Sequence, residues 1–130
     1  MEEQNKPKTI VIVEDDESLA EIYKIRLEAL GYTCYVAYNG IIALYFIQKE
    51  LPDLVLLDLM IPDISGGQVL QTMRDTRWGK NIKVLVVSNL NESEAPSNIR
   101  DLNIEDYLVK ANLSNDQLDQ KVISILNSDN

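Results

Sequence analysis

Five apolar segments, each followed by polar residues or a turn signal, divide the chain. Their residues are mostly β-branched, aliphatic or aromatic, and they lie at 9–13, 32–37, 54–57, 82–87 and 106–109. Short apolar runs of this kind are typical of strands buried on both faces, as in a parallel sheet. The run at 54–57 ends on Asp58, and Pro62 and a glycine pair follow within a few residues. We place the centre of function at Asp58, because chemistry in open parallel sheets gathers where the strands end.

Apolar residues at three- and four-residue steps fill the intervals and predict five helices. The predicted ranges are 17–30, 41–49, 67–75, 92–102 and a last helix that follows Ser114. Asp16 fits an N-cap of the first helix, and Ser114 with Gln117 fits a capping box for the last. Pro96 disturbs the fourth range, because proline fits only the first turn of a helix. We expect that helix to begin late, to be short or to be loose.

This alternation of strands and helices predicts an α/β fold, a doubly wound, five-stranded parallel sheet of the flavodoxin-like (βα)5 type. No linker, repeat or low-complexity tract interrupts the alternation. We therefore expect a single domain over residues 1–130, with a core from about residue 8 to residue 127.

Residues with charged or hydroxyl side chains, which could take part in catalysis or binding, follow four of the five predicted strands. They are Glu14 and Asp15, Asp58, Ser88 and Lys110, whereas the second strand ends on an uncharged Tyr-Asn-Gly sequence. With the second strand at an edge, in the order 2-1-3-4-5, the other four strand ends surround one crevice. Singly, each of these residues is more often a turn, cap or surface residue. Their joint placement at four neighbouring positions of the sheet is what favours a site.

Composition narrows the possible partners. The formal net charge of −9 argues against direct binding of nucleic acid, and it suits a metal cation or a partner with a basic surface. The sequence has no histidine, which excludes a histidine triad, a His-ligated zinc site and a phosphohistidine of its own.

Cys34 is the single cysteine, and its apolar surroundings indicate a buried thiol. No apolar run approaches the roughly 18 residues of a membrane span, and residues 1–8 lack a signal-peptide core, so we expect a cytoplasmic protein.

The three carboxylates Glu14, Asp15 and Asp58 would repel one another in a common crevice, so the arrangement requires a cation. Oxygen ligands of this type favour Mg²⁺ or Mn²⁺. Asp58 could then use a free oxygen to attack phosphorus and form an aspartyl phosphate. The ammonium of Lys110 would neutralise the transferring oxygens, and the hydroxyl of Ser88 could donate to another oxygen.

Several landmarks resemble the receiver domains of response regulators, of the CheY-like kind, over essentially the whole chain. They are Val-Glu-Asp-Asp at 13–16, Leu-Asp-Leu-Met-Ile-Pro at 57–62, Gly66, Ser88 and Asp-Tyr-Leu-Val-Lys at 106–110. The resemblance implies that Asp58 is the phosphoacceptor and that Ser88 and Lys110 hold the phosphoryl group. It implies metal ligation by Asp15 directly, by Glu14 largely through water and by the backbone carbonyl of Met60. It also implies that Tyr107 is a switch residue that turns inward.

The function that this resemblance implies is a phosphorylatable signalling switch of a two-component system or phosphorelay. The phosphoryl donor would be the phosphohistidine of a sensor histidine kinase or of a histidine phosphotransfer protein. Output would pass to a downstream protein through the face of the fourth helix, the fifth strand and the last helix, or by onward transfer of the phosphate. Such a domain catalyses its own phosphorylation and slow dephosphorylation and is not an enzyme acting on a separate metabolite. Only residues 128–130 follow the last helix, so we expect a stand-alone receiver, although a domain cut from a longer protein would read the same.

Two alternative functions use related chemistry. A phosphatase of the haloacid-dehalogenase kind also has an aspartate nucleophile and Mg²⁺, but it requires a second aspartate two residues later, where this chain has Met60. A pseudo-receiver would bind partners without phosphorylation, and the intact set of Glu14, Asp15, Asp58, Ser88 and Lys110 speaks against it.

Departures from the family pattern lead to further expectations. Receivers have a proline after the lysine, preceded by a cis peptide; here the residue is Ala111, for which a trans peptide is expected. Asn89 follows Ser88 and is expected to crowd the inward path of Tyr107, while Asn103 can take a left-handed backbone and still end a helix.

Four apolar residues carry two more expectations, each weighed against simple packing. Met60 and Leu90 would flank the phosphoryl group and cannot orient water, which predicts a long-lived aspartyl phosphate. On the first helix, Ile22 and Ile25 lie beside the core stripe, and Ile25 in particular is predicted to contact a donor helix.

Overall fold

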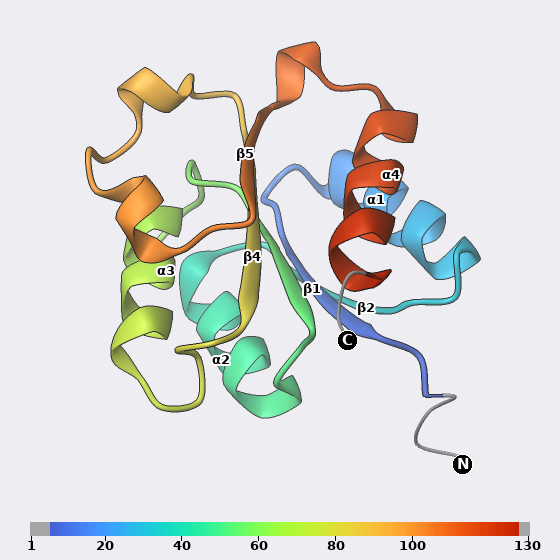
Figure 1. Ribbon diagram of the computed structural model, residues 1–130, viewed down its shortest axis with the longest axis horizontal. Coiled ribbons are helices and arrows are strands. Elements are labelled where there is room, and N and C mark those ends of the chain that lie inside the picture. Colours follow the sequence, from blue (N-terminus) through green and yellow to red (C-terminus); the bar gives the residue numbers. More distant parts are fainter. Residues whose placement is uncertain (1–5, 128–130) are drawn as a thin grey trace.

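Five parallel strands form one sheet in the order β2-β1-β3-β4-β5 (Figure 1), which confirms the predicted topology. The structure is a computed structural model that describes residues 6–127; the expectations on the first five and last three residues lie outside the described residues. The strands are β1 (Thr9–Val13), β2 (Thr33–Ala37), β3 (Leu54–Leu57), β4 (Lys83–Ser88) and β5 (Asp106–Val109). The central strand β3 is buried along its whole length, which explains why it is apolar at every position.

Four α-helices among the described residues cover the two faces of the sheet. They are α1 (Glu17–Ala29), α2 (Gly40–Glu50), α3 (Gly66–Asp75) and α4 (Asn115–Asn127). Figure 1 shows α1 and α4 on one side and α2 and α3 on the other. Alternate residues of β1 serve the two layers: Ile10 and Ile12 pack towards α1 and α4, and Val11 and Val13 towards α2 and α3. None of the helices in residues 6–127 has the length and apolar character to cross a bilayer.

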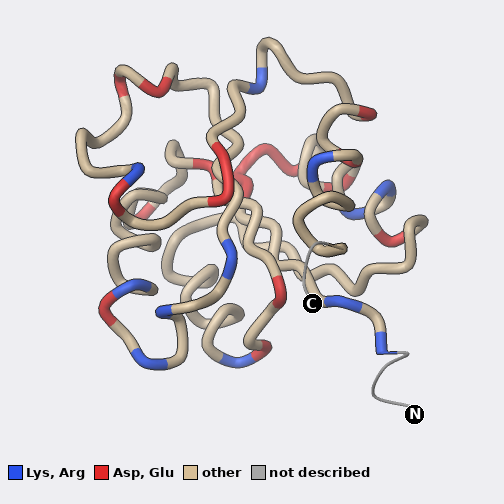
Figure 2. The backbone as a smooth tube through the Cα atoms, in the orientation of Figure 1, with Lys and Arg blue, Asp and Glu red and all other residues tan. Residues whose placement is uncertain are grey.

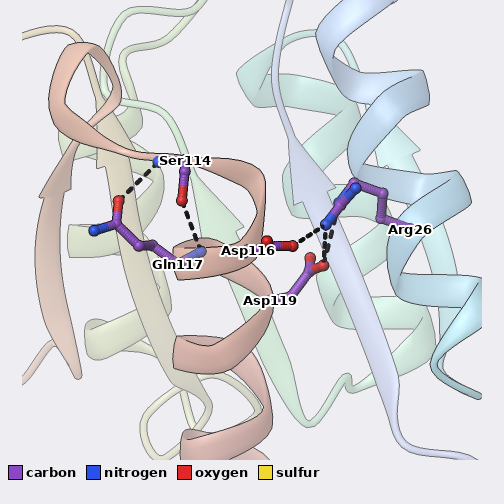
Figure 3. Close-up of polar contacts among 5 residues, drawn as sticks. All are labelled: Arg26, Ser114, Asp116, Gln117 and Asp119. Atoms are coloured by element: carbon purple, nitrogen blue, oxygen red, sulfur yellow. Dashed lines mark hydrogen bonds and ion pairs between the residues drawn. The ribbon is translucent and has the colours of Figure 1, made fainter.

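Side chains close the exposed ends of the helices as the sequence predicts. Asp16 accepts a hydrogen bond from the backbone N–H of Leu19 at 3.1 Å and so caps α1. Ser114 and Gln117 form the predicted capping box of α4, in which each side chain accepts from the other residue's backbone N–H (Figure 3).

An ion pair joins the two helices of one layer. Arg26 of α1 donates to Asp116 at 2.9 Å and to Asp119 at 2.6 Å, both on α4 (Figure 3). This contact links helices that lie at opposite ends of the sequence.

A continuous α-helix over 92–102 does not form, and the expectation that Pro96 would leave only short helical structure there is confirmed. Two short 3₁₀ segments, η2 (Glu92–Glu94) and η3 (Ile99–Leu102), stand in its place, on either side of Pro96. Proline lacks the N–H that an α-helix needs, so the helical hydrogen-bond pattern cannot run through position 96. The segment ends at Asn103, whose φ of 60° is the expected left-handed stop.

Charged side chains hold this irregular segment on the domain. Arg74 of α3 donates to the carbonyl oxygens of Leu102 at 2.7 Å and of Asn103 at 3.1 Å. The same guanidinium also donates to the carbonyl of Gly79 at 2.9 Å, in the loop after α3. Within the segment, Arg100 pairs with Glu92. Tertiary contacts of this kind fix a conformation that local sequence preference does not describe.

Candidate functional site

Four strand ends converge at the carboxyl edge of the sheet, where the sequence predicts a site. Residue pairing in the sheet sets Val13 beside Leu57, so the next residues, Glu14 and Asp58, are also neighbours. The backbone N–H of Asp58 donates to the carbonyl of Val13 at 3.1 Å, which extends the ladder by one bond. The position of Asp58 is therefore set by the rigid centre of the sheet rather than by a loop.

Glu14, Asp15 and Asp58 form a cluster of carboxylates. One oxygen from each lies within 4.8 Å of the others, a spacing that one metal ion can bridge. Glu14 is 2% exposed and Asp58 is 4% exposed, whereas Asp15 faces solvent. Hard oxygen ligands with one open side are the donor set that a small divalent cation prefers, so these residues fit such an ion.

Lys110, at the end of β5, reaches across to this cluster. Its Nζ lies 2.7 Å from Oδ2 of Asp58 and 2.5 Å from Oε1 of Glu14. Burial by itself lowers the pKa of Lys110, but the hydrogen bonds to Asp58 and Glu14 outweigh it, and the pKa is raised overall. The ammonium is thus held in its charged form between two buried carboxylates. Its contact with Asp58 was expected from the strand ends; its equally close contact with Glu14 was not.

Glu14 has a raised pKa in spite of this partner. Desolvation by burial is the largest cause, and the hydrogen bonds from Lys110 and from the backbone of Asp16 offset only part of it. A cation bound beside the cluster would stabilise the ionised form of Glu14, so binding and ionisation are coupled.

A glycine lets helix α3 approach the backbone of Asp58. A Cβ on Gly66 would lie 2.2 Å from the carbonyl oxygen of Asp58 and 2.6 Å from the Cα of Leu59. The N–H of Gly66 donates to the carbonyl of Leu59 at 3.1 Å, which ties the start of α3 to the strand end. At the start of the loop that runs from Asp58 to Gly66, the N–H of Met60 donates to Oδ1 of Asp58 at 3.0 Å.

Ser88 and Tyr107 lie on the neighbouring strands β4 and β5. Ser88 is fully buried at the end of β4. The ring of Tyr107 is also buried, and its hydroxyl donates to the carbonyl oxygen of Leu90 at 2.9 Å. Asn89, the next residue after Ser88, is exposed, and its expected crowding of Tyr107 stays a prediction. Sequence reasoning missed the carbonyl of Leu90 as the acceptor, because side-chain patterns say nothing of where a loop carbonyl points.

The peptide after Lys110 is trans, as expected for alanine at position 111, and no cis peptide occurs within residues 6–127. A short 3₁₀ turn, η4 (Lys110–Asn112), begins there. The lysine reaches Asp58 from this turn. Close approach of the ammonium thus does not depend on a proline at the next position.

Comparison with known proteins places the chain in a family. Residues 10–123 match the family model of the response regulator receiver domain. The chain is 31% identical over 123 residues to the probable transcriptional regulator ycf27 of Porphyra purpurea, covering 95% of this chain and 49% of that protein. It is 32% identical over 104 residues to the polar-differentiation response regulator DivK of Brucella anthropi, covering 80% of this chain and 85% of that protein.

A solved structure supports the same assignment. The response regulator TrrA of Thermotoga maritima, in complex with Mg²⁺ and BeF, superposes with a TM-score of 0.77 at 30% identity, over 91% of this chain and 98% of that one. The present chain spans about half the length of the algal ycf27 protein and most of the length of DivK. Together with the convergence of carboxylates, lysine and serine at one end of the sheet, these matches show that the chain belongs to the response regulator receiver domain family of two-component signalling.

Proposed function

We propose that Asp58 accepts a phosphoryl group from the phosphohistidine of a sensor histidine kinase or a histidine phosphotransfer protein. The observation that carries this proposal is the 2.7 Å contact between Nζ of Lys110 and Oδ2 of Asp58, beside a cluster of three carboxylates. Because these 130 residues include no histidine, the phosphohistidine must lie outside them.

In the proposed transfer, a carboxylate oxygen of Asp58 attacks phosphorus as the P–N bond to the donor imidazole breaks. The new O–P bond forms the aspartyl phosphate, and the imidazole leaves with the bonding electron pair and takes up a proton. Lys110 moves from the carboxylate to a phosphoryl oxygen, and the hydroxyl of Ser88 donates to another. Glu14, Asp15, Asp58 and the backbone carbonyl of Met60 would hold Mg²⁺ or Mn²⁺, and the ion would supply positive charge to the site.

We propose that a donor helix docks beside α1. Ile25 is exposed on this helix, in keeping with the expectation from its place beside the core stripe, and Ile22 is also exposed. A hollow of about 270 Å³ lies next to Lys110, lined in part by Leu19 and Tyr23 of α1 and by Asn89. A side chain of the donor could enter there on its way to Asp58. Phosphotransfer from the cognate donor should slow in Ile25→Glu; an unchanged rate would remove α1 from the proposal.

Output would use the surface of η3, β5 and α4, or onward transfer of the phosphate. On this surface, Asp106 of β5 joins both neighbouring elements, through Arg100 of η3 at 3.7 Å and Lys121 of α4 at 2.8 Å. A downstream protein that binds here would sense any movement of β5 around the buried Tyr107. In this proposal the domain acts on no separate metabolite and contacts no nucleic acid directly.

Phosphorylation by a small phosphodonor in the presence of Mg²⁺, followed by intact-mass spectrometry, tests the central claim. The wild-type protein should gain one phosphate, and Asp58→Asn should gain none. Asp63→Asn is the matched control, because Asp63 is an exposed aspartate on the same loop and should leave the gain intact. Absence of the adduct in the wild type would favour a pseudo-receiver, and rapid release of phosphate without an adduct would favour a phosphatase.

A further inference from the structure

Tyr23 and Tyr107 are the buried tyrosines among residues 6–127, and only the hydroxyl of Tyr107 has a hydrogen-bond partner. Tyr107 is 7% exposed and donates to the carbonyl of Leu90. Tyr23, on α1, is 6% exposed, and its hydroxyl makes no hydrogen bond within the described part of the chain. A phenylalanine would fill the same space without a polar group. A buried hydroxyl that lacks a partner therefore points to a ligand from outside.

The hydroxyl of Tyr23 opens onto the hollow of about 270 Å³ beside Lys110, which Tyr23 helps to line. Every fully buried side-chain nitrogen or oxygen in residues 6–127 has a hydrogen-bond partner, so an oxygen without one must lie at an accessible surface. Side chains of a helix lean towards its N-terminus, and α1 begins at the edge of the sheet that carries Asp58. Both observations place the hydroxyl at the wall of the hollow rather than in the core.

The charges of the phosphoacceptor site act on Tyr23. Burial is the largest cause that raises the pKa of Tyr23 to about 12; the ammonium of Lys110 lowers this pKa, and the carboxylates of Glu14, Asp58 and Asp16 raise it. Figure 2 shows these charges, with the chain red where β1 leads into α1 and blue where β5 leads into η4. At neutral pH the phenol is protonated, so it can donate a hydrogen bond beside the residues that are proposed to carry out the transfer.

The lining of the hollow suits a small planar ring with one polar edge. Apolar side chains on its wall include Leu19, Leu113 and Leu118, and polar ones include Asn89 and Lys110. Apolar walls with a few polar groups that fix orientation are typical of ligand sites. The imidazole of a phosphohistidine has two apolar faces, a nitrogen bonded to phosphorus and a second nitrogen that accepts a hydrogen bond.

We propose that Tyr23 binds the imidazole of the phosphohistidine donor, with its hydroxyl donating to the ring nitrogen that does not carry phosphorus. This inference rests on the proposed phosphotransfer to Asp58. As the P–N bond breaks and the O–P bond to Asp58 forms, the bonding electron pair stays with the ring, and the second nitrogen becomes a stronger acceptor. The hydrogen bond from Tyr23 therefore strengthens towards the transition state. The ring then takes up a proton from water and leaves as imidazole.

Two small donors with a P–N bond test this role. Phosphoimidazole has the second ring nitrogen, and phosphoramidate has none. Tyr23→Phe removes the hydroxyl and keeps the ring. Its second-order rate constant for phosphorylation by phosphoimidazole should fall about three- to tenfold, as expected for one lost hydrogen bond, and that for phosphoramidate by less than about twofold. Intact-mass spectrometry over time in Mg²⁺ gives both rate constants.

Tyr32→Phe is the matched control. Tyr32 follows the opposite end of α1, packs against the same core cluster as Tyr23 and does not line the hollow. This variant should react with both donors as the wild type does. Unchanged thermal unfolding, followed by circular dichroism, will show that both variants are folded.

The two donors separate failure of this inference from failure of the proposed function. An equal fall with both donors in Tyr23→Phe would mean that the hydroxyl only supports the structure of the site, and would overturn the inference. So would a variant that reacts with phosphoimidazole at the wild-type rate. If the wild type reacts with phosphoramidate alone, the proposed function stands and the imidazole site does not. A wild-type protein that takes phosphate from neither donor would overturn the proposed function and this inference with it.

Discussion

The Nζ atom of Lys110 lies 2.5 Å from Oε1 of Glu14 and 2.7 Å from Oδ2 of Asp58, so the lysine pairs with two carboxylates that follow the neighbouring strands β1 and β3. Its own strand, β5, is separated from β3 by β4. The ion pair therefore spans four strands of the sheet at the edge where the chemistry is proposed. The same positive charge balances two acids before phosphorylation and would be available to the phosphoryl oxygens afterwards.

Replacement of this lysine should destabilise the domain. Lys110→Met keeps most of the stem but leaves Glu14 and Asp58 buried without their ammonium partner, at a cost of about 3 kcal/mol in the free energy of unfolding. Added Mg²⁺ should restore more stability to the variant than to the wild type, because the ion replaces the missing positive charge. Urea unfolding with and without Mg²⁺ measures both effects. Equal stability of variant and wild type in the absence of the ion would show that the pair contributes nothing.

The raised pKa of Glu14 predicts a specific dependence on pH. Its contribution to stability is fully present below its unfolded pKa, which is near 4.5, and is lost as pH rises through the higher folded pKa. Glutamine does not ionise, so Glu14→Gln should not show this fall in the free energy of unfolding. The variant should therefore gain stability relative to the wild type as pH rises above 4.5. Unfolding free energies measured across this range provide the comparison. A difference between the two proteins that does not change with pH would contradict the raised pKa.

Replacement by alanine should have opposite effects on the stability of the domain at two adjacent glycines, Gly66 and Gly67. Gly66→Ala places a methyl group against the carbonyl oxygen of Asp58 and should cost about 2 kcal/mol while it slows phosphorylation. Gly67→Ala meets Pro96 only at 3.4 Å and lies inside α3, so it should stabilise the helix by about 0.5 kcal/mol. Thermal unfolding and phosphate incorporation should be measured on both. Similar behaviour of the two variants would mean that the approach of α3 to Asp58 is not as close as it is described above.

Sequence reasoning reached the fold and much of the site for one physical reason. Buried parallel strands are apolar at nearly every position, so the end of each strand can be located in the sequence where the apolar run stops. The topology of the sheet then brings polar residues at those ends, such as Asp58 and Lys110, close together. The direct pairing of Lys110 with Glu14 escaped prediction because it depends on how far one side chain reaches. The carbonyl of Leu90, which accepts from Tyr107, has no side-chain signal at all.

The segment between β4 and β5 shows where local pattern fails. Its apolar residues allow a helix, and only Pro96 warned against one. The end of the segment is held by Arg74, which is distant in sequence and donates to the carbonyls of Leu102 and Asn103. No periodicity within the segment carries that information.

Arg74 should therefore control the order of this segment. Arg74→Leu leaves the carbonyls at the end of η3 without their donors and should lower the free energy of unfolding by about 2 kcal/mol. Amide exchange should speed up in residues 99–103, while the sheet keeps its protection. Arg77→Leu is the matched control, because Arg77 is exposed in the same part of the chain. If exchange in η3 stays at the wild-type rate in Arg74→Leu, another contact holds the segment.

The aspartyl phosphate should be long-lived. Met60 is 55% exposed and lies two residues beyond Asp58, and Leu90 packs partly buried two residues beyond Ser88. Neither side chain can hydrogen-bond a water molecule in line with the phosphorus, so the purified, phosphorylated domain should lose its phosphate over many minutes in Mg²⁺. Met60→Asn offers an amide at this position and should shorten the half-life several-fold, while the exposed control Ile41→Asn, on α2, should not. The loss of phosphate is measured by intact-mass spectrometry after removal of the phosphodonor. A wild-type half-life of seconds would show that other groups position the water.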